Sequence, residues 1–188
     1  MNYIILTGAW VIYLTLHSIL ASNYIKGKAE KVGIRGSNYR LLYSMVSTIG
    51  IAILGWYMIN LPGRVLFNIL LLKIFGGLLL IAGLIILWLS FKYLSGLEFV
   101  GLKRADSEKH LVTSGIHSRL RHPIYTGTIL ILVGYFLNAP TDTLLISSIV
   151  ILVYLPIGIY FEEKKLILKF GKEYLEYKQR VPALIPKF

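Results

Sequence analysis

The sequence contains no cysteine. Disulfide bonds, thiolate nucleophiles and metal sites built on cysteine are therefore excluded. The four histidines lack the HExxH spacing of a zinc protease, so we expect no metal centre. Charged residues are also scarce, at 15% of the chain against about 25% in an average soluble domain. The composition is therefore atypical of a water-soluble protein.

Apolar residues are correspondingly abundant. They occupy 56% of the 188 positions, and the mean hydropathy is +0.68. Their concentration in long uncharged runs is typical of an integral membrane protein. We interpret the chain as an all-α integral membrane protein with a single membrane-embedded domain, residues 1–188, made of a three-helix part, 1–98, and a C-terminal part, 99–188. The runs predict five membrane-spanning helices, at about residues 3–21, 41–59, 74–91, 124–137 and 143–161.

The last two runs are joined by the short link NAPTD, residues 138–142. Proline and asparagine in so short a link predict a turn, and hence a helical hairpin. The first helix of this hairpin, 124–137, has only fourteen residues, which is short for a hydrocarbon core about 30 Å thick. We therefore expect it to begin below the membrane surface, in a protein-lined or hydrated recess. Pro156 is expected to kink the second helix.

The predicted loops differ in charge. Residues 22–40 hold five basic residues against one acidic residue, and residues 92–122 hold six against three. The links 60–73 and 138–142 are poorer in basic residues. By the positive-inside rule, the basic loops and the C-terminal tail are cytoplasmic and the N-terminus is outside. The net charge of +11 then reflects loops that face anionic membrane lipid, and we expect no nucleic-acid partner.

Polar chemistry collects on this cytoplasmic side in two segments. One is KHLVTSGIHSRLRHPIYTG, residues 109–127, and the other begins with FEEKKL at residue 161. An antiparallel hairpin returns to the face that it left, so the near ends of its two helices meet. We therefore expect three residues of the first segment to lie close to two carboxylates of the second: His122, Pro123 and Tyr125 beside Glu162 and Glu163.

Each of these residues also has a purely structural interpretation. Proline lacks the N–H group that is unsatisfied at a helix start, so Pro123 can simply begin a helix. The carboxylates directly follow a long uncharged run, where they are costly unless paired or hydrated. Other polar residues are interpretable as interfacial anchors, as packing residues of an amphipathic helix, or as a hydrogen-bonding partner of a neighbouring helix: Arg119 and Arg121, Tyr174 and Tyr177, and His17, respectively.

The combination of LVTSG…RHPIYTG with EEKKLILKFGKEYLEYKQRVPALIP after a hairpin resembles the isoprenylcysteine carboxyl methyltransferase family of membrane enzymes. The wider group includes phospholipid methyltransferases and small-thiol methyltransferases related to the NnrU proteins. The resemblance covers residues 109–188, where several features agree in order and spacing. Near the N-terminus, HSILAS and YRLLYS resemble the NnrU and methanethiol methyltransferase branch.

The resemblance implies an enzyme that uses S-adenosyl-L-methionine, in a cytoplasmic pocket closed by the C-terminal tail, to methylate a lipophilic or small thiol substrate. The cationic amino group and sulfur of this cofactor match the carboxylate of Glu162, and its own carboxylate matches Arg121. The resemblance assigns catalytic roles to Arg121 and Glu163. It assigns cofactor binding to His110, Leu111, Val112, His117, His122, Pro123, Ile124, Tyr125 and Glu162.

Two positions depart from the family pattern. Relatives commonly carry Gly-x-Tyr before the RHP motif, whereas this chain has GIH, with His117 in the tyrosine position. An imidazole there can alter the cofactor contact or act as a base near the acceptor. Enzymes that act on prenylcysteine carboxylates typically carry an arginine one helical turn before the first glutamate, at the position of Gly158. A thiol acceptor does not need that cation, so the departure favours a small thiol or a lipid.

Three alternatives stay open from the sequence. The chain can still be a prenylcysteine carboxyl methyltransferase. Sterol-type membrane reductases share a related hairpin with an RHP-like motif but bind NADPH, and they usually end in an Asp-Glu pair with a cysteine and a tryptophan-containing tail. A non-catalytic membrane role in nitrogen-oxide metabolism has been suggested for NnrU relatives.

Overall fold

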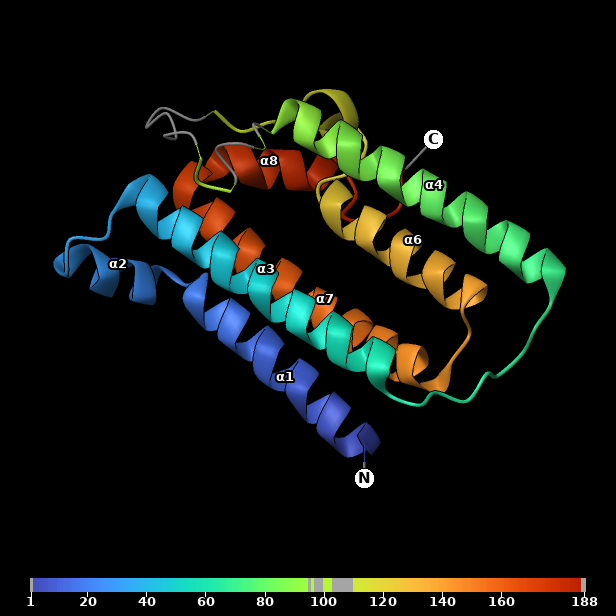
Figure 1. Ribbon diagram of the computed structural model, residues 1–188. Helices are drawn as coiled ribbons and strands as arrows, with labels where there is room; N and C mark the ends of the chain where they lie inside the picture. Colours follow the sequence, from blue (N-terminus) through green and yellow to red (C-terminus); the bar gives the residue numbers. More distant parts are fainter. Residues whose placement is uncertain (1, 95, 97–99, 103–109, 187–188) are drawn as a thin grey trace. The chain divides into compact units, whose positions relative to one another are not determined.

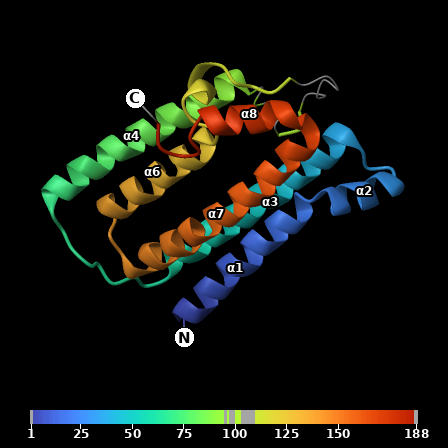
Figure 2. The same ribbon diagram turned by 180° about the vertical axis from the view of Figure 1, so that it is seen from behind.

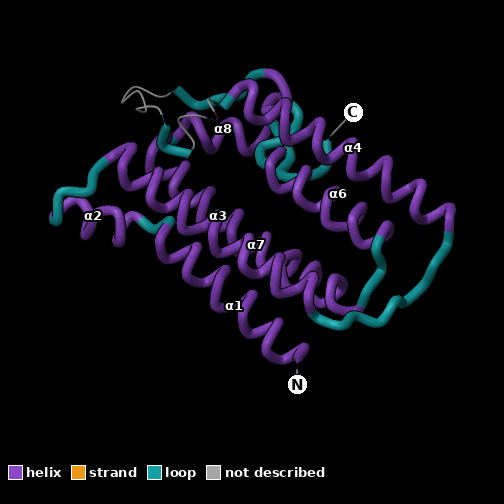
Figure 3. The backbone as a smooth tube through the Cα atoms, viewed as in Figure 1, coloured by secondary structure: helices purple, strands orange, loops and turns teal. Residues whose placement is uncertain are grey.

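The computed structural model describes residues 2–94, 96, 100–102 and 110–186. Within these residues the regular structure is helical, apart from one isolated antiparallel bridge between Val65 and Thr141 (Figure 3). The all-α prediction is therefore confirmed for the described part of the chain. The elements are α1 (Asn2–Leu20), α2 (Asn23–Lys31), α3 (Gly36–Asn60), α4 (Leu70–Tyr93), the 3₁₀ helix η1 (Gly115–Ser118), α6 (Pro123–Asn138), α7 (Asp142–Phe170) and α8 (Lys172–Arg180).

Four of these helices, α1, α3, α4 and α7, are long and apolar enough to cross a membrane. They correspond to four of the five predicted spans. The remaining one, α6, is apolar but has only 16 residues, so a fifth crossing stays a prediction. Helix α7 continues nine residues beyond the predicted end of its span at residue 161. Glutamate and lysine are good helix formers, so the backbone stays helical after the apolar run has ended.

The chain forms two compact units, of which the first comprises residues 1–63 and 95–109. In this unit α1 contacts α3, and the side-chain hydroxyl of Tyr39 donates a hydrogen bond to the carbonyl oxygen of Leu20. His17 lies 2.8 Å from the hydroxyl of Tyr43 and 3.0 Å from that of Ser47, both on α3. The hydrogen bonding of His17 to a neighbouring helix, expected from its structural interpretation, is therefore present.

The second unit comprises residues 64–94 and 110–188, and its main contact joins α4 and α6. The two helices run side by side in both views (Figures 1 and 2). A Cβ atom at Gly76 would lie 2.8 Å from the carbonyl oxygen of Gly134, and one at Gly83 would lie 2.8 Å from that of Gly127. Glycines spaced seven residues apart on each helix thus let the two backbones approach closely, as small residues do between membrane helices.

This packing places α4 in the same unit as the C-terminal helices, although the sequence grouped it with the first two spans. The proposed boundary between residues 98 and 99 lies outside the described residues. So do several charges of the predicted cytoplasmic loop: Glu98, Lys103, Arg104, Asp106, Glu108 and Lys109.

The predicted turn at 138–142 joins α6 to α7, and α7 continues through Pro156. The hydroxyl of Thr141 caps α7 by accepting a hydrogen bond from a backbone N–H. The link before α4 lies against this turn, because the N–H of Leu66 donates to the carbonyl of Pro140 at 2.8 Å. The N–H of Arg64 donates to the carboxylate of Asp142 at 2.9 Å. The end of the hairpin opposite the RHP motif is therefore held by hydrogen bonds to the link before α4.

Candidate functional site

The RHP motif comprises the last two residues of the short segment between η1 and α6 and the first residue of α6. Pro123 is the first residue of α6, where the N–H that proline lacks would have no intrahelical partner. His122 precedes it but makes no side-chain capping bond. The structural interpretation of Pro123 is therefore correct, and the His122 side chain is available for other contacts.

The C-terminal tail lies along this motif. The N–H groups of Arg121 and His122 donate to the carbonyl oxygens of Pro182 and Ala183, at 2.9 and 3.0 Å. One turn into α6, the hydroxyl of Thr126 donates to the carbonyl of Leu184 at 2.9 Å. Three successive tail carbonyls thus satisfy donors at the start of α6, which fixes the position of the motif relative to the tail.

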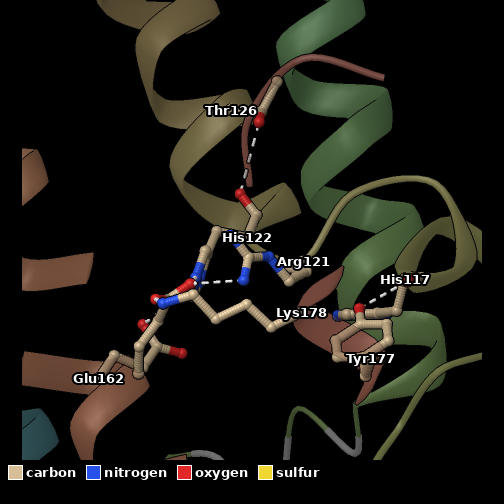
Figure 4. A network of polar contacts seen from close by, with 8 residues as sticks. His117, Arg121, His122, Thr126, Glu162, Tyr177 and Lys178 are labelled. Carbon is tan, nitrogen blue, oxygen red and sulfur yellow. Dashed lines mark hydrogen bonds and ion pairs between the residues drawn. The ribbon is translucent and has the colours of Figure 1, made fainter. Parts of the chain in front are cut away.

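Glu163 is the centre of the polar cluster that the tail covers. Only 8% of the residue is exposed, although it carries a charge. Its Oε1 atom lies 3.0 Å from Nη1 of Arg121 and 3.2 Å from Nε2 of His122, and its Oε2 atom accepts a hydrogen bond from Lys178 (Figure 4). A buried carboxylate is stable only when it is paired in this way.

The two neighbouring glutamates differ sharply in environment. The Glu162 side chain is 45% exposed, and its Oε2 atom lies 3.9 Å from Nδ1 of His122, beyond hydrogen-bonding distance. The ring of Tyr125 packs edge-on against that of His122, with 5.6 Å between centroids. The predicted proximity of the RHP segment to the two carboxylates is therefore confirmed. Glu163 is the paired, buried member and Glu162 is the accessible one.

Helix α8 contributes two tyrosines, which the sequence already marked as packing residues, and one lysine, which it did not. Tyr174 and Tyr177 are almost completely buried, as their packing interpretation predicts, and the Tyr177 hydroxyl donates to the carbonyl of His117 at 2.6 Å. Burial raises the pKa of Tyr177 to about 12, so the hydroxyl keeps its proton at neutral pH. Lys178 was not predicted as a site residue. Its position four residues after Tyr174, on the same face of a helix, is the signal that could have identified it.

His117 is 5% exposed, and among the described residues its Nδ1 atom has no hydrogen-bond partner. Burial, and then the charge of His122, lower the pKa of the His117 imidazole, so the neutral ring is favoured. Nε of Arg121 is also buried without a partner in the described part of the chain. Nη1 of Arg121 lies within ion-pair distance of Glu163 but outside hydrogen-bond geometry. Among the described residues, the buried Nδ1 atom of His117 and the buried Nε atom of Arg121 therefore remain available to bind a ligand.

The other residues predicted to bind the cofactor are less buried than His117 and His122. His110 is exposed and lies outside the helices, and Leu111, Val112 and Ile124 are half-buried. Gly158 faces the aromatic part of the site, because a Cβ atom there would lie 3.1 Å from the hydroxyl of Tyr125. Within the described residues, no three histidine, cysteine, aspartate or glutamate side chains are grouped so that they could hold a metal ion.

The chain is similar to membrane methyltransferases. It is 36% identical to methanethiol S-methyltransferase 1 of Bradyrhizobium diazoefficiens over 56% of this chain and 39% of that protein. It is 34% identical to protein-S-isoprenylcysteine O-methyltransferase B of Arabidopsis thaliana, over 49% of this chain and 48% of the relative. A methanethiol S-methyltransferase of Crocosphaera subtropica is 26% identical over 95% of this chain and 72% of the relative.

The first two of these matches cover less than half of each relative. No solved structure matches the chain significantly. The model of the phospholipid methyltransferase family matches residues 71–173, from α4 to the start of α8, and so includes the RHP motif and both glutamates. Because this match spans more than half of the sequence, the chain belongs to the phospholipid methyltransferase family.

Proposed function

We propose that the chain is an integral membrane methyltransferase that uses S-adenosyl-L-methionine and methylates a small thiol or another lipophilic acceptor. The proposal rests on one observation: the segment of the sequence that matches the family overlaps the segment that forms the polar cluster. The segment that matches the family also holds the motif and both glutamates of the cluster in which a buried carboxylate meets an arginine and a histidine.

The polar groups of the cluster fit this methyl donor. The cofactor has a cationic amino group and a free carboxylate at one end. Glu162 offers a partly exposed carboxylate for the cation. The Nε–H of Arg121, which has no partner among the described residues, offers a donor for the anion. The neutral imidazole of His117 adds a second unused polar atom without adding positive charge. The donor set therefore suits a ligand that carries charges of both signs.

S-adenosyl-L-methionine supplies an electrophilic methyl group when bound. The task of the chain is then to orient the acceptor and exclude water, because an in-line displacement depends chiefly on alignment. In this proposal Glu163 holds Arg121 and His122 in place, while the tail carbonyls of 182–184 fix the backbone of the motif. Such rigid support keeps the side chains of the motif in a fixed orientation when the cofactor and the acceptor bind.

The acceptor region is proposed at Gly158 and Tyr125. The glycine leaves no side chain, and hence no cation, where the prenylcysteine enzymes that the chain resembles typically carry arginine. Its lack of a Cβ atom also lets the Tyr125 hydroxyl approach α7. The nearest side chains to a Cβ atom at Gly158 are those of Tyr125 and Tyr154, and the lack of a cation at this position favours a small thiol over a carboxylate. Methylation of a prenylcysteine carboxylate is the second candidate, supported by the relatives that bear that name.

We further propose that α6 crosses part of the membrane from a recess, with the cluster and the C-terminus on the cytoplasmic side and the N-terminus outside. The basic loops support this orientation through the positive-inside rule. The cofactor would then enter from the cytosol, while a lipophilic acceptor would arrive from the bilayer.

The test begins with isothermal titration of the purified full-length chain with S-adenosylhomocysteine and with NADPH. Binding of the first alone is expected. Binding of NADPH alone would replace the proposal by a reductase. Labelled S-adenosyl-L-methionine is then supplied with methanethiol, a farnesylcysteine analogue or phosphatidylethanolamine. Turnover chiefly of the farnesylcysteine analogue would show that the absence of a cation at Gly158 does not select the acceptor.

A further inference from the structure

Helix α2 lies at one end of the α1–α3 pair. It is joined to both helices by short links, and the Tyr39–Leu20 hydrogen bond holds the end of α1 beside the start of α3. The Ser22 hydroxyl caps α2 by accepting a hydrogen bond from the N–H of Ile25 at 3.3 Å. Because α1 and α3 are both long and apolar enough to cross a membrane, α2 lies where such a pair would emerge from the hydrocarbon.

The residues of α2 are divided by helical spacing into distinct sides. Ile25, Ala29 and then Val32, which follows the helix, share one apolar side, and 75% of Val32 is exposed. Lys28 borders this side on one flank and Lys26 on the other, whereas Lys31 lies farther round the helix. The single acidic residue, Glu30, points away from the apolar side. An apolar stripe flanked by lysines is the pattern of a helix that lies in a membrane interface.

Two lysines of α2, Lys28 and Lys31, are exposed and accessible to an external partner. The ammonium group of Lys28 lies 4.6 Å from the centre of the Tyr24 ring, and 69% of Tyr24 is exposed. Among the described residues, neither Lys28 nor Lys31 forms an ion pair with a carboxylate. Arg35 is exposed just beyond the helix. Exposed tyrosine beside lysine is also the composition found at the headgroup level of membranes.

We propose that α2 is a docking surface for anionic phospholipid headgroups. Its apolar side rests at the boundary of the acyl chains, while Lys28 and Lys31 contact the phosphates. Charge complementarity selects this occupant, because the surface is basic and zwitterionic lipid offers it no net negative charge. The inference concerns α2 alone and does not depend on the proposed methyltransferase activity.

The test is native mass spectrometry of the full-length chain, titrated in detergent with phosphatidylglycerol or phosphatidylcholine. The wild-type chain should prefer phosphatidylglycerol. The double variant Lys28→Gln/Lys31→Gln should lose roughly ten- to thirtyfold in affinity for that lipid, since each lysine near an anionic surface contributes substantially. Glu30→Gln should strengthen binding. The matched control, Lys169→Gln/Lys172→Gln, removes the same number of exposed charges elsewhere and should leave the affinity unchanged.

Equal affinity of the wild-type chain for the two lipids would overturn the proposal. So would equal loss in the two double variants, because binding would then follow total charge and not α2. The Glu30→Gln variant guards against misfolding, since a gain in affinity cannot result from damage to the helix.

Discussion

The ammonium group of Lys178 on α8 pairs with Oε2 of Glu163 on α7, fifteen residues earlier in the chain. The other carboxylate oxygen, Oε1, faces Arg121 and His122. One buried carboxylate therefore joins the tail to the RHP motif, and each of its oxygens serves a different partner segment. This arrangement makes separate predictions for each member of the cluster.

Replacement of Lys178 should loosen the tail. Lys178→Met removes a charge-assisted hydrogen bond to a buried carboxylate, but the lysine is partly exposed and two partners remain. We expect a loss of about 1–2 kcal/mol in the free energy of unfolding, measured by thermal unfolding in detergent. Lys178→Arg should restore most of it. Lys172→Met, at an exposed ion pair with Glu176, should have little effect. Equal effects at positions 172 and 178 would contradict the assignment.

The two glutamates should respond differently to neutralisation. Glu163→Gln leaves Arg121 and Lys178 without their counter-charge, and should cost about 3 kcal/mol of stability. Glu162→Gln should change stability by less than about 0.5 kcal/mol, because its side chain is partly exposed. It should nevertheless weaken S-adenosylhomocysteine binding at least roughly tenfold through the lost charge. Titration calorimetry measures this, and unchanged affinity would remove Glu162 from the proposed site.

The close approach of α4 and α6 should be sensitive to one added methyl group. Gly76→Ala places a Cβ atom 2.8 Å from the backbone oxygen of Gly134, and should destabilise the chain by about 1–3 kcal/mol. Its neighbour on α4 provides the control, because a Cβ atom at Gly77 would meet nothing within 4 Å. Gly77→Ala should be neutral or slightly stabilising. A thermal unfolding midpoint lowered equally by both variants would show that the packing is not decisive.

His117 should make the stability depend on pH. Burial lowers the pKa of its imidazole below the ordinary value of 6.5, so the unfolded chain binds this proton more readily than the folded chain. The contribution of the neutral ring is complete above pH 6.5 and decreases as the pH falls below that value. The unfolding midpoint, measured between pH 7 and 5, should vary less in His117→Gln. The slope should persist in His110→Gln, because His110 is exposed; an unchanged slope in His117→Gln would contradict the assignment.

Much of the helical framework was predictable because hydropathy and turn signals are local. Uncharged runs identified α1, α3, α4 and α7, and NAPTD identified the turn before α7. The meeting of His122 with the glutamate pair was predictable as well, since an antiparallel hairpin must bring its ends together. The contact between α4 and α6 was not predicted, because close approach depends on which glycines of two distant helices face each other.

The sequence by itself therefore determined the membrane-compatible helices and the chemistry gathered beside the RHP motif. Only the tertiary structure decided which carboxylate is buried. Glu162 and Glu163 are adjacent, but successive residues point about 100° apart on a helix, and the rotation of α7 turns one inward and the other toward solvent. The same holds for Lys178 and the tail carbonyls of 182–184. The partner of Lys178 is set by the turn between α7 and α8, and those of the tail carbonyls by the return of the chain after α8, which no local pattern encodes.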